Sequence, residues 1–210
     1  MRKFLIVILL LSSLFFTFSC SRYKKIPQSK YNVNQVITPF DSSFDKILFK
    51  SKIYFYKKYF TGLLFIKQTA KHNFRIVFIS EIGKKIFDFE LNNKKFDVKY
   101  IMPVIDKKIL IKTLHKDFVL MLLSDVTYTK KITAYKNDSL TLYKVKNNYG
   151  RNFIYYKTKK LVLLENANKI RKIIKINYTD YKNNFPQTIN IKHKNIKLKL
   201  NLKTVEQDVN

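Results

Sequence analysis

Apolar and polar residues alternate along most of the chain beyond its N-terminal segment. Phe87, Phe89 and Leu91 are each followed by a polar residue, and the same alternation returns at residues 96–100 and 197–203. A period of two puts apolar side chains on one face of a half-buried antiparallel strand and polar side chains on the other. About ten or eleven such segments, joined by short polar links, predict an antiparallel sheet whose strands run up and down in sequence order.

One segment in the middle of the chain has a helical period instead. Residues 104–123 carry apolar side chains at a helical spacing, mostly four positions apart, at Ile105, Ile109, Leu110, Leu114, Phe118 and Leu122. Pro103 just before the segment and Asp106 in its first turn suit a helix start. The pattern predicts one apolar helix inserted halfway along the sheet.

A sheet with that many strands must curl, and its apolar residues then line the concave face. The helix can fill only part of that space, so the remainder is either a packed aromatic core or a ligand cavity. The walls of an open cavity are expected to include Leu64, Ile66, Phe87, Phe89, Ile109 and Phe118. The predicted fold class is therefore mainly β, within α+β: a curled antiparallel barrel of about 10–11 strands with one inserted helix.

The first twenty residues have the order of a secretory signal peptide. Arg2 and Lys3 precede an apolar run at residues 4–16, which is too short to span a bilayer. The only cysteine of the chain, Cys20, follows this run, and the segment resembles the lipobox of bacterial lipoproteins. The resemblance implies cleavage before Cys20 and a diacylglyceryl anchor on its sulfur. The alternatives are an unmodified cysteine in an ordinary signal peptide and an uncleaved anchor.

These features divide the chain into three parts. Residues 1–19 are predicted to be a lipoprotein signal peptide. Residues 20–43 are polar, contain Pro27 and Pro39 and show no sustained period, so they are expected to form the lipidated N-terminus and a tether. Residues 44–210 are predicted to form the folded domain.

The net charge is large and positive, but its distribution does not indicate a nucleic-acid partner. The chain has 42 Lys and Arg against 14 Asp and Glu, a formal charge of +28, which first indicates a nucleic acid or an anionic membrane as partner. Lys is spread along the chain and its runs are only pairs, whereas nucleic-acid-binding arms are usually blocks of five or more like charges. Lys, Asn, Ile, Phe and Tyr, all abundant here, have A/T-rich codons, so genome composition alone can produce this excess. We expect no nucleic-acid partner, and lysine faces that tolerate an anionic membrane.

The residues of an enzyme or metal site are not grouped in the sequence. His72, His115 and His193 lie far apart without a ligand-spaced partner, and one cysteine excludes a Cys-based zinc site or an internal disulfide. Ser124 and Asp125 lack the Gly-x-Ser-x-Gly turn of a hydrolase nucleophile. We therefore expect no enzyme activity, no cofactor and no metal.

Three stretches resemble the LolA/LolB superfamily of lipoprotein localisation. They are an early strand with a glycine at residues 60–66, the hairpin at residues 74–91, and the closing pattern of two hairpins at residues 176–205. The resemblance implies a half-open antiparallel barrel with an apolar cavity for acyl chains. It also places Ile82, just before Gly83, where the receptor of that family carries an exposed apolar residue, in a membrane-insertion loop, that helps insert the cargo. The alternative for Ile82 is an ordinary turn residue that packs back on the sheet.

Two functions follow from these expectations. The first is an outer-membrane lipoprotein that is anchored through Cys20, faces the periplasm and binds lipid or lipoprotein acyl chains in its concave cavity, in lipoprotein sorting to the outer membrane. Its expected partners are membrane lipid, the acyl chains of other lipoproteins and a periplasmic carrier, and it is expected to be a monomer. The second is a structural or assembly lipoprotein with a filled barrel and no ligand. The two functions are distinguished by the interior of the barrel: an open apolar cavity of several hundred Å³ supports acyl-chain binding, and a filled interior supports the structural role.

Overall fold

The computed structural model describes residues 29–33, 36–40, 44–92, 95–125, 132–136 and 139–205. The predicted signal peptide and Cys20 lie outside these residues. Within them, no helix is both long enough and apolar enough to span a bilayer.

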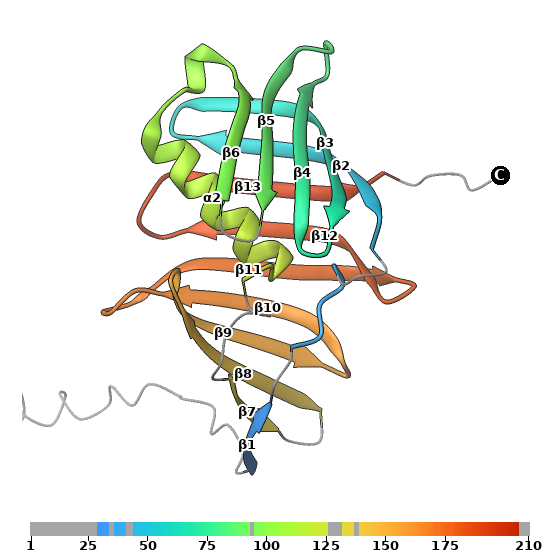
Figure 1. Ribbon diagram of the computed structural model, residues 1–210, viewed down its shortest axis with the longest axis vertical. Coiled ribbons are helices and arrows are strands. Elements are labelled where there is room, and N and C mark those ends of the chain that lie inside the picture. Colours follow the sequence, from blue (N-terminus) through green and yellow to red (C-terminus); the bar gives the residue numbers. More distant parts are fainter. Residues whose placement is uncertain are drawn as a thin grey trace, which may run out of the picture.

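The described residues form thirteen strands and one long helix (Figure 1). The strands are β1 Ser29–Val33, β2 Lys46–Phe55, β3 Lys58–Ala70, β4 Asn73–Ser80, β5 Lys85–Asn92, β6 Lys95–Ile101, β7 Ile132–Lys136, β8 Leu140–Asn147, β9 Gly150–Lys157, β10 Lys160–Ala167, β11 Lys172–Lys182, β12 Phe185–His193 and β13 Leu198–Thr204. A short 3-10 turn, η2 Pro103–Ile105, precedes the helix α2 Lys108–Leu122.

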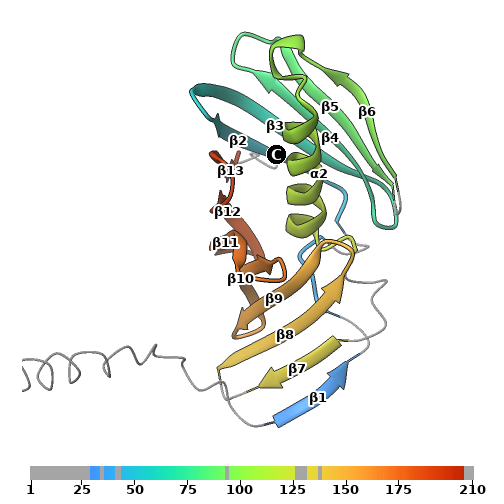
Figure 2. The same ribbon diagram turned by 90° about the vertical axis from the view of Figure 1, so that its left-hand side faces the viewer.

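All thirteen strands belong to one antiparallel sheet. Their order is β1-β7-β8-β9-β10-β11-β12-β13-β2-β3-β4-β5-β6, so β6 and β1 are the two edges. The sheet curls, and α2 lies in its concave side (Figure 2). The mainly β class with one inserted helix is as the alternation predicts, and the sheet has more strands than the ten or eleven expected.

The period-two pattern does place apolar side chains on the concave face. In β4 the residues Phe74, Ile76 and Phe78 are fully buried, while the intervening Arg75 and Val77 are only half-buried. Direct pairing continues this inner face into β3 and β5, because Ile76 lies opposite both Ile66 and Phe89. The buried residues of the sheet and the helix form one continuous core.

The helix begins later than the sequence pattern predicts. Pro103 and Ile105 belong to η2, and the backbone becomes α-helical only at Lys108. At the other end, Leu123 has a left-handed conformation (φ 55°), and its N–H donates to carbonyls of the last turn. This arrangement satisfies carbonyls that the helix end leaves without a partner.

Part of the segment predicted as a tether packs on the domain. The strand β1 pairs with β7, and the side chains of Val36 and Phe40 are buried in the core. The Tyr156 hydroxyl donates to the Ile37 carbonyl, and the Thr38 hydroxyl donates to the Leu122 carbonyl at 3.5 Å. The stretch just before the predicted domain boundary therefore contributes to the concave side of the sheet.

Candidate functional site

The concave face is occupied by the apolar side of α2. Leu110, Leu114 and Phe118 are fully buried against the sheet, as is the helix from Asp117 to its end. The Phe118 ring lies 6.1 Å from that of Phe87 and 6.5 Å from that of Phe89, and those two rings stack at 4.5 Å. Aromatic contacts of this kind join the helix to β5.

Five of the six residues predicted to line a cavity come together here. Leu64, Ile66, Phe87, Phe89 and Phe118 all have exposed fractions of 0 or 1%. Space for even one water molecule beside these side chains would expose more of their surface, so they form a packed core in this structure. Ile109 is not with them. Its side chain is 56% exposed, on the other side of the helix from Leu110 and Leu114.

The second half of α2 carries the polar links to the sheet. His193 Nε2 of β12 lies 2.9 and 3.0 Å from the two carboxylate oxygens of Asp117, and both side chains are buried. The Tyr178 hydroxyl of β11 donates to the Met121 carbonyl at 2.9 Å. Burial raises the pKa of Asp117, and the hydrogen bond and charge of His193 oppose that shift. These contacts fix the C-terminal half of the helix to strands β11 and β12.

The first half of α2 borders a groove at the open edge of the sheet. The groove has a volume of about 390 Å³ and lies beside edge strand β6, with walls formed by Phe96, Asp106, Lys108, Ile111, Lys112 and His115. The His115 ring stacks on Phe96 at 4.4 Å and lies within hydrogen-bond distance, 3.2 Å, of the Tyr149 hydroxyl. Burial lowers the pKa of His115, which favours the neutral ring at pH 7. The inner wall of the groove is therefore apolar and aromatic, with charged groups at its rim.

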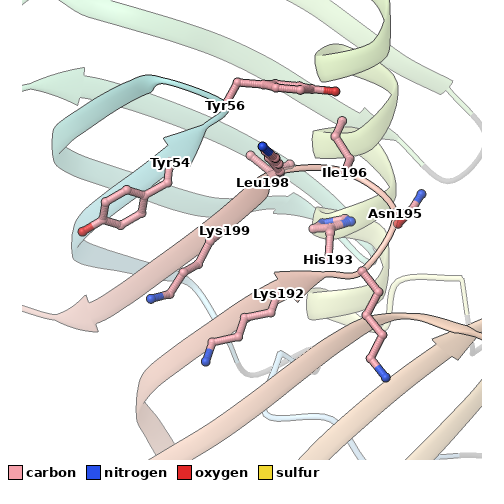
Figure 3. Close-up of a pocket in the computed structure, with 10 residues that line it drawn as sticks. Tyr54, Tyr56, Lys192, His193, Asn195, Ile196, Leu198 and Lys199 are labelled. Atoms are coloured by element: carbon pink, nitrogen blue, oxygen red, sulfur yellow. The ribbon is translucent and has the colours of Figure 1, made fainter.

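Two larger grooves, each of about 650 Å³, lie elsewhere on the molecule. One lies between the β2–β3 and β12–β13 turns and has four lysines around Tyr54 and Tyr56 (Figure 3). The other lies under the segment that contains Ile37 and Phe44, beside the β9–β10 and β11–β12 turns.

Ile82 lies at the tip of the β4–β5 turn and is 79% exposed, so it does not pack back on the sheet. Gly83 beside it has a left-handed backbone (φ 77°), which suits glycine in a tight turn. In the described part of the chain, no three His, Cys, Asp or Glu side chains are grouped so that they could hold a metal ion.

Sequence reasoning missed the Asp117–His193 pair. The two residues are 76 positions apart, in a helix and in a strand, and no spacing rule connects them. The exposure of Ile109 did have a signal, because Lys112, Thr113 and Lys116 follow it at the positions that share its helix face. Its neighbours therefore place Ile109 on the polar side.

The sequence matches no protein-family model and no curated protein. The structure is similar to that of a LolA superfamily protein from Nitrosomonas europaea, with a TM-score of 0.53 and 10% identity over 81% of this chain and 90% of that one. A domain assigned provisionally to outer membrane lipoprotein sorting, from Vibrio parahaemolyticus, has a TM-score of 0.45 and 7% identity over 80% of this chain and 86% of that one. A DUF1329 family protein from Desulfovibrio piger also has a TM-score of 0.45, with 8% identity over 80% and 88% of the two chains. At 10% identity, the similarity to the Nitrosomonas europaea protein shows the fold alone. The chain has the fold of a LolA superfamily protein.

Proposed function

We propose that this protein is a membrane-anchored lipoprotein that binds acyl chains between α2 and the concave face of its sheet. The observation that carries the proposal is the groove of about 390 Å³ along α2 at the open edge, which continues the apolar face of the helix toward solvent. Its volume is within the range of small-molecule sites. The LolA-like fold supports the proposal as an analogy.

Binding an acyl chain requires the helix to move, because the interior is packed in this structure. The first half of α2 buries only Leu110 and Leu114 deeply, whereas every residue from Asp117 to Leu122 is buried. The buried contacts Asp117–His193 and Tyr178–Met121 also lie in the second half, whereas the described side-chain hydrogen bond of the first half to another element is that of His115 to Tyr149, in the β8–β9 turn. The mechanism we propose is a pivot about the C-terminal half that widens the groove beside Phe96 and Ile111.

A bound acyl chain offsets the free-energy cost of such a pivot. Exposing Leu110 and Leu114 costs about 1.5–3 kcal/mol for each side chain. An acyl chain that takes their place returns about 25 cal/mol for each Å² of apolar surface that it buries. The helix therefore closes the site when no ligand is present, and this keeps apolar surface out of water.

Anchoring belongs to the same proposal. A lipid on Cys20 would hold the domain at the outer membrane, facing the periplasm, where a periplasmic carrier could deliver lipoprotein acyl chains to it. Labelled palmitate should then be incorporated by the wild-type chain and lost in Cys20→Ala. Equal labelling of the two would exclude the anchor.

A second candidate is a structural or assembly lipoprotein without a ligand. The packing of Leu64, Phe87 and Phe118 favours it, because a filled interior needs no ligand for stability. In that case the groove along α2 is a surface feature, and α2 stays in place as a permanent part of the core.

One experiment separates the two candidates. The full chain is purified, non-covalent lipid is extracted for mass spectrometry, and uptake of a fluorescent fatty acyl probe is measured. The acyl-binding candidate predicts bound lipid, with uptake that Ile111→Glu abolishes and Ile109→Glu preserves, because only Ile111 faces the groove. Absence of both lipid and uptake in the wild type would establish the structural candidate.

A further inference from the structure

Four hairpins that are consecutive in the sheet turn at the same end of their strands. Their turns are residues 168–171, 194–197, 56–57 and 81–84, which we call the turn edge; the neighbouring β8–β9 turn, residues 148–149, lies at the same end but contains no basic residue and is not included. Each turn contains one large apolar residue and at least one basic residue. The apolar residues are Ile170, Ile196, Tyr56 and Ile82, and the basic residues are Lys169, Arg171, Lys194, Lys197, Lys57 and Lys84.

The opposite end of the same sheet provides an internal comparison. Its described turns are Lys71-His72, Thr158-Lys159 and Asn183-Asn184, which contain no aliphatic, Phe or Tyr residue. Biased codon usage would affect both ends alike, so it does not account for the difference. The apolar residues are concentrated at one end of the sheet.

Three of the four apolar residues are largely in contact with solvent. The exposed fractions are 89% for Ile170, 79% for Ile82 and 57% for Tyr56, and the first two are the highest among the large hydrophobic side chains described. Ile196, the fourth, packs partly against the core. None of the six basic side chains of the turn edge forms an ion pair with a described residue, and the only acid there is Glu81.

The groove of about 650 Å³ lies between two of these turns (Figure 3). Lys192 and Lys199, on its wall, are direct cross-strand partners, and Lys192 is also opposite Lys175 on β11. Like charges directly opposite each other destabilise a sheet. Lys199 Nζ lies 5.5 Å from the centre of the Tyr54 ring, and none of the three lysines has a carboxylate partner among the described residues. An anion bound in this groove would relieve the repulsion.

We propose that the turn edge docks on an anionic membrane surface, with Ile170 and Tyr56 in the interface and a lipid phosphate in the lysine groove. Aliphatic and tyrosine side chains at the headgroup level, flanked by lysines, are typical of such contacts. The proposal rests on Ile170, Tyr56 and the lysines; Ile82 lies at the same end. It does not depend on acyl binding, because it needs neither movement of α2 nor an interior site.

The spacing of the tips favours a lipid surface over an acidic protein. Neighbouring tips are two strands apart, about 10 Å, so the apolar residues are separated by basic ones and form no continuous apolar patch. A protein interface usually has a continuous apolar core with charges at its rim. Three of the turns lie along the left side of the molecule in Figure 1, the side that faces the viewer in Figure 2.

The test measures contact of the turn edge with lipid in the full, anchored chain. Asn195→Cys, in the β12–β13 turn, and Thr69→Cys, near the opposite end, are each labelled with an environment-sensitive fluorophore and reconstituted in vesicles. In vesicles with equal parts of phosphatidylglycerol and phosphatidylcholine, the label at position 195 should shift to the blue and be quenched by nitroxide lipids. It should do so much less in pure phosphatidylcholine, and the label at position 69 should change in neither. Equal responses at both positions, or none at position 195, would overturn the proposal.

Two further arms identify what is recognised. Adding Tyr56→Ser and Ile170→Ser to the chain labelled at position 195 should reduce the shift severalfold, whereas Ile37→Ser, at another exposed site, should not. Inorganic phosphate at millimolar concentration should not displace the label from anionic vesicles. If it does, the groove is a site for free anions and the membrane proposal is wrong.

Discussion

Asp117 and His193 lie in the apolar interior, where an ionised carboxylate is poorly solvated. Burial raises the pKa of Asp117 above its ordinary value. The pair therefore favours keeping a proton in the folded protein. An acid with a raised folded pKa stabilises the fold at low pH, and that contribution is lost as the pH rises from its unfolded pKa of about 3.9 through the folded value.

Asp117→Asn should make the free energy of unfolding depend less on pH. The free energy of unfolding of the wild type should fall more steeply than that of the variant as the pH rises from about 4 toward 7, because only the wild type loses the proton. Urea unfolding at several pH values measures both slopes. Asp106→Asn, at an exposed position, is the control and should keep the wild-type slope. Parallel slopes for wild type and Asp117→Asn would contradict the assignment.

Gly62 is constrained by the neighbouring strand. A Cβ atom at this position would lie 2.0 Å from the Ile79 carbonyl oxygen of β4, which is backbone and cannot rotate away. We predict that Gly62→Ala lowers the free energy of unfolding by about 1–3 kcal/mol, as overpacking generally does. Thr61→Ala, one residue earlier and on the outer face, should change it much less in the same urea titration.

At the scale of elements, α2 is the part of the core that determines whether the concave face is open. Phe118→Ala would remove the ring that contacts Phe87 and Phe89, and we predict a loss of about 3–5 kcal/mol. Ile109→Ala, on the exposed side of the same helix, should change stability by about 0.5 kcal/mol or less. Similar losses of stability for the two variants would show that α2 does not bury Phe118 while leaving Ile109 exposed.

The strands were predictable because their pattern is local. Phe87, Phe89 and Leu91 show which face points into the core without any knowledge of their partners, although Ile86 and Asp88 on the other face are buried as well. The start of α2 was predicted too early, since the local apolar period continues through Ile105 while the backbone there makes a 3-10 turn. The strand β1 could not be recognised because it depends on pairing with β7, about a hundred residues later.

At the scale of the whole molecule, the candidate site was only partly predictable. The sequence pattern indicates which residues face the interior, and five of the six named for the cavity wall do lie there. Whether they enclose a cavity depends on how closely α2 packs against Phe87 and Phe89. The spacing of apolar residues along the sequence does not indicate that distance. The turn edge was missed for a related reason: each turn is unremarkable alone, and the sheet order brings four of them to one end.

The charge of +28 is also a property of the whole molecule. Lysines such as Lys175, Lys192 and Lys199 are direct neighbours across strands, so the folded chain repels itself more than the expanded unfolded chain does. Salt screens this repulsion, since the Debye length falls from about 30 Å at 0.01 M to about 8 Å at 0.15 M. We predict that the Tm rises over that range of sodium chloride, whereas a protein held by surface ion pairs loses stability. Potassium chloride should give the same rise, because screening does not depend on the identity of the cation. A Tm that falls with salt would mean that contacts such as the Arg75–Asp88 ion pair outweigh the repulsion between lysines.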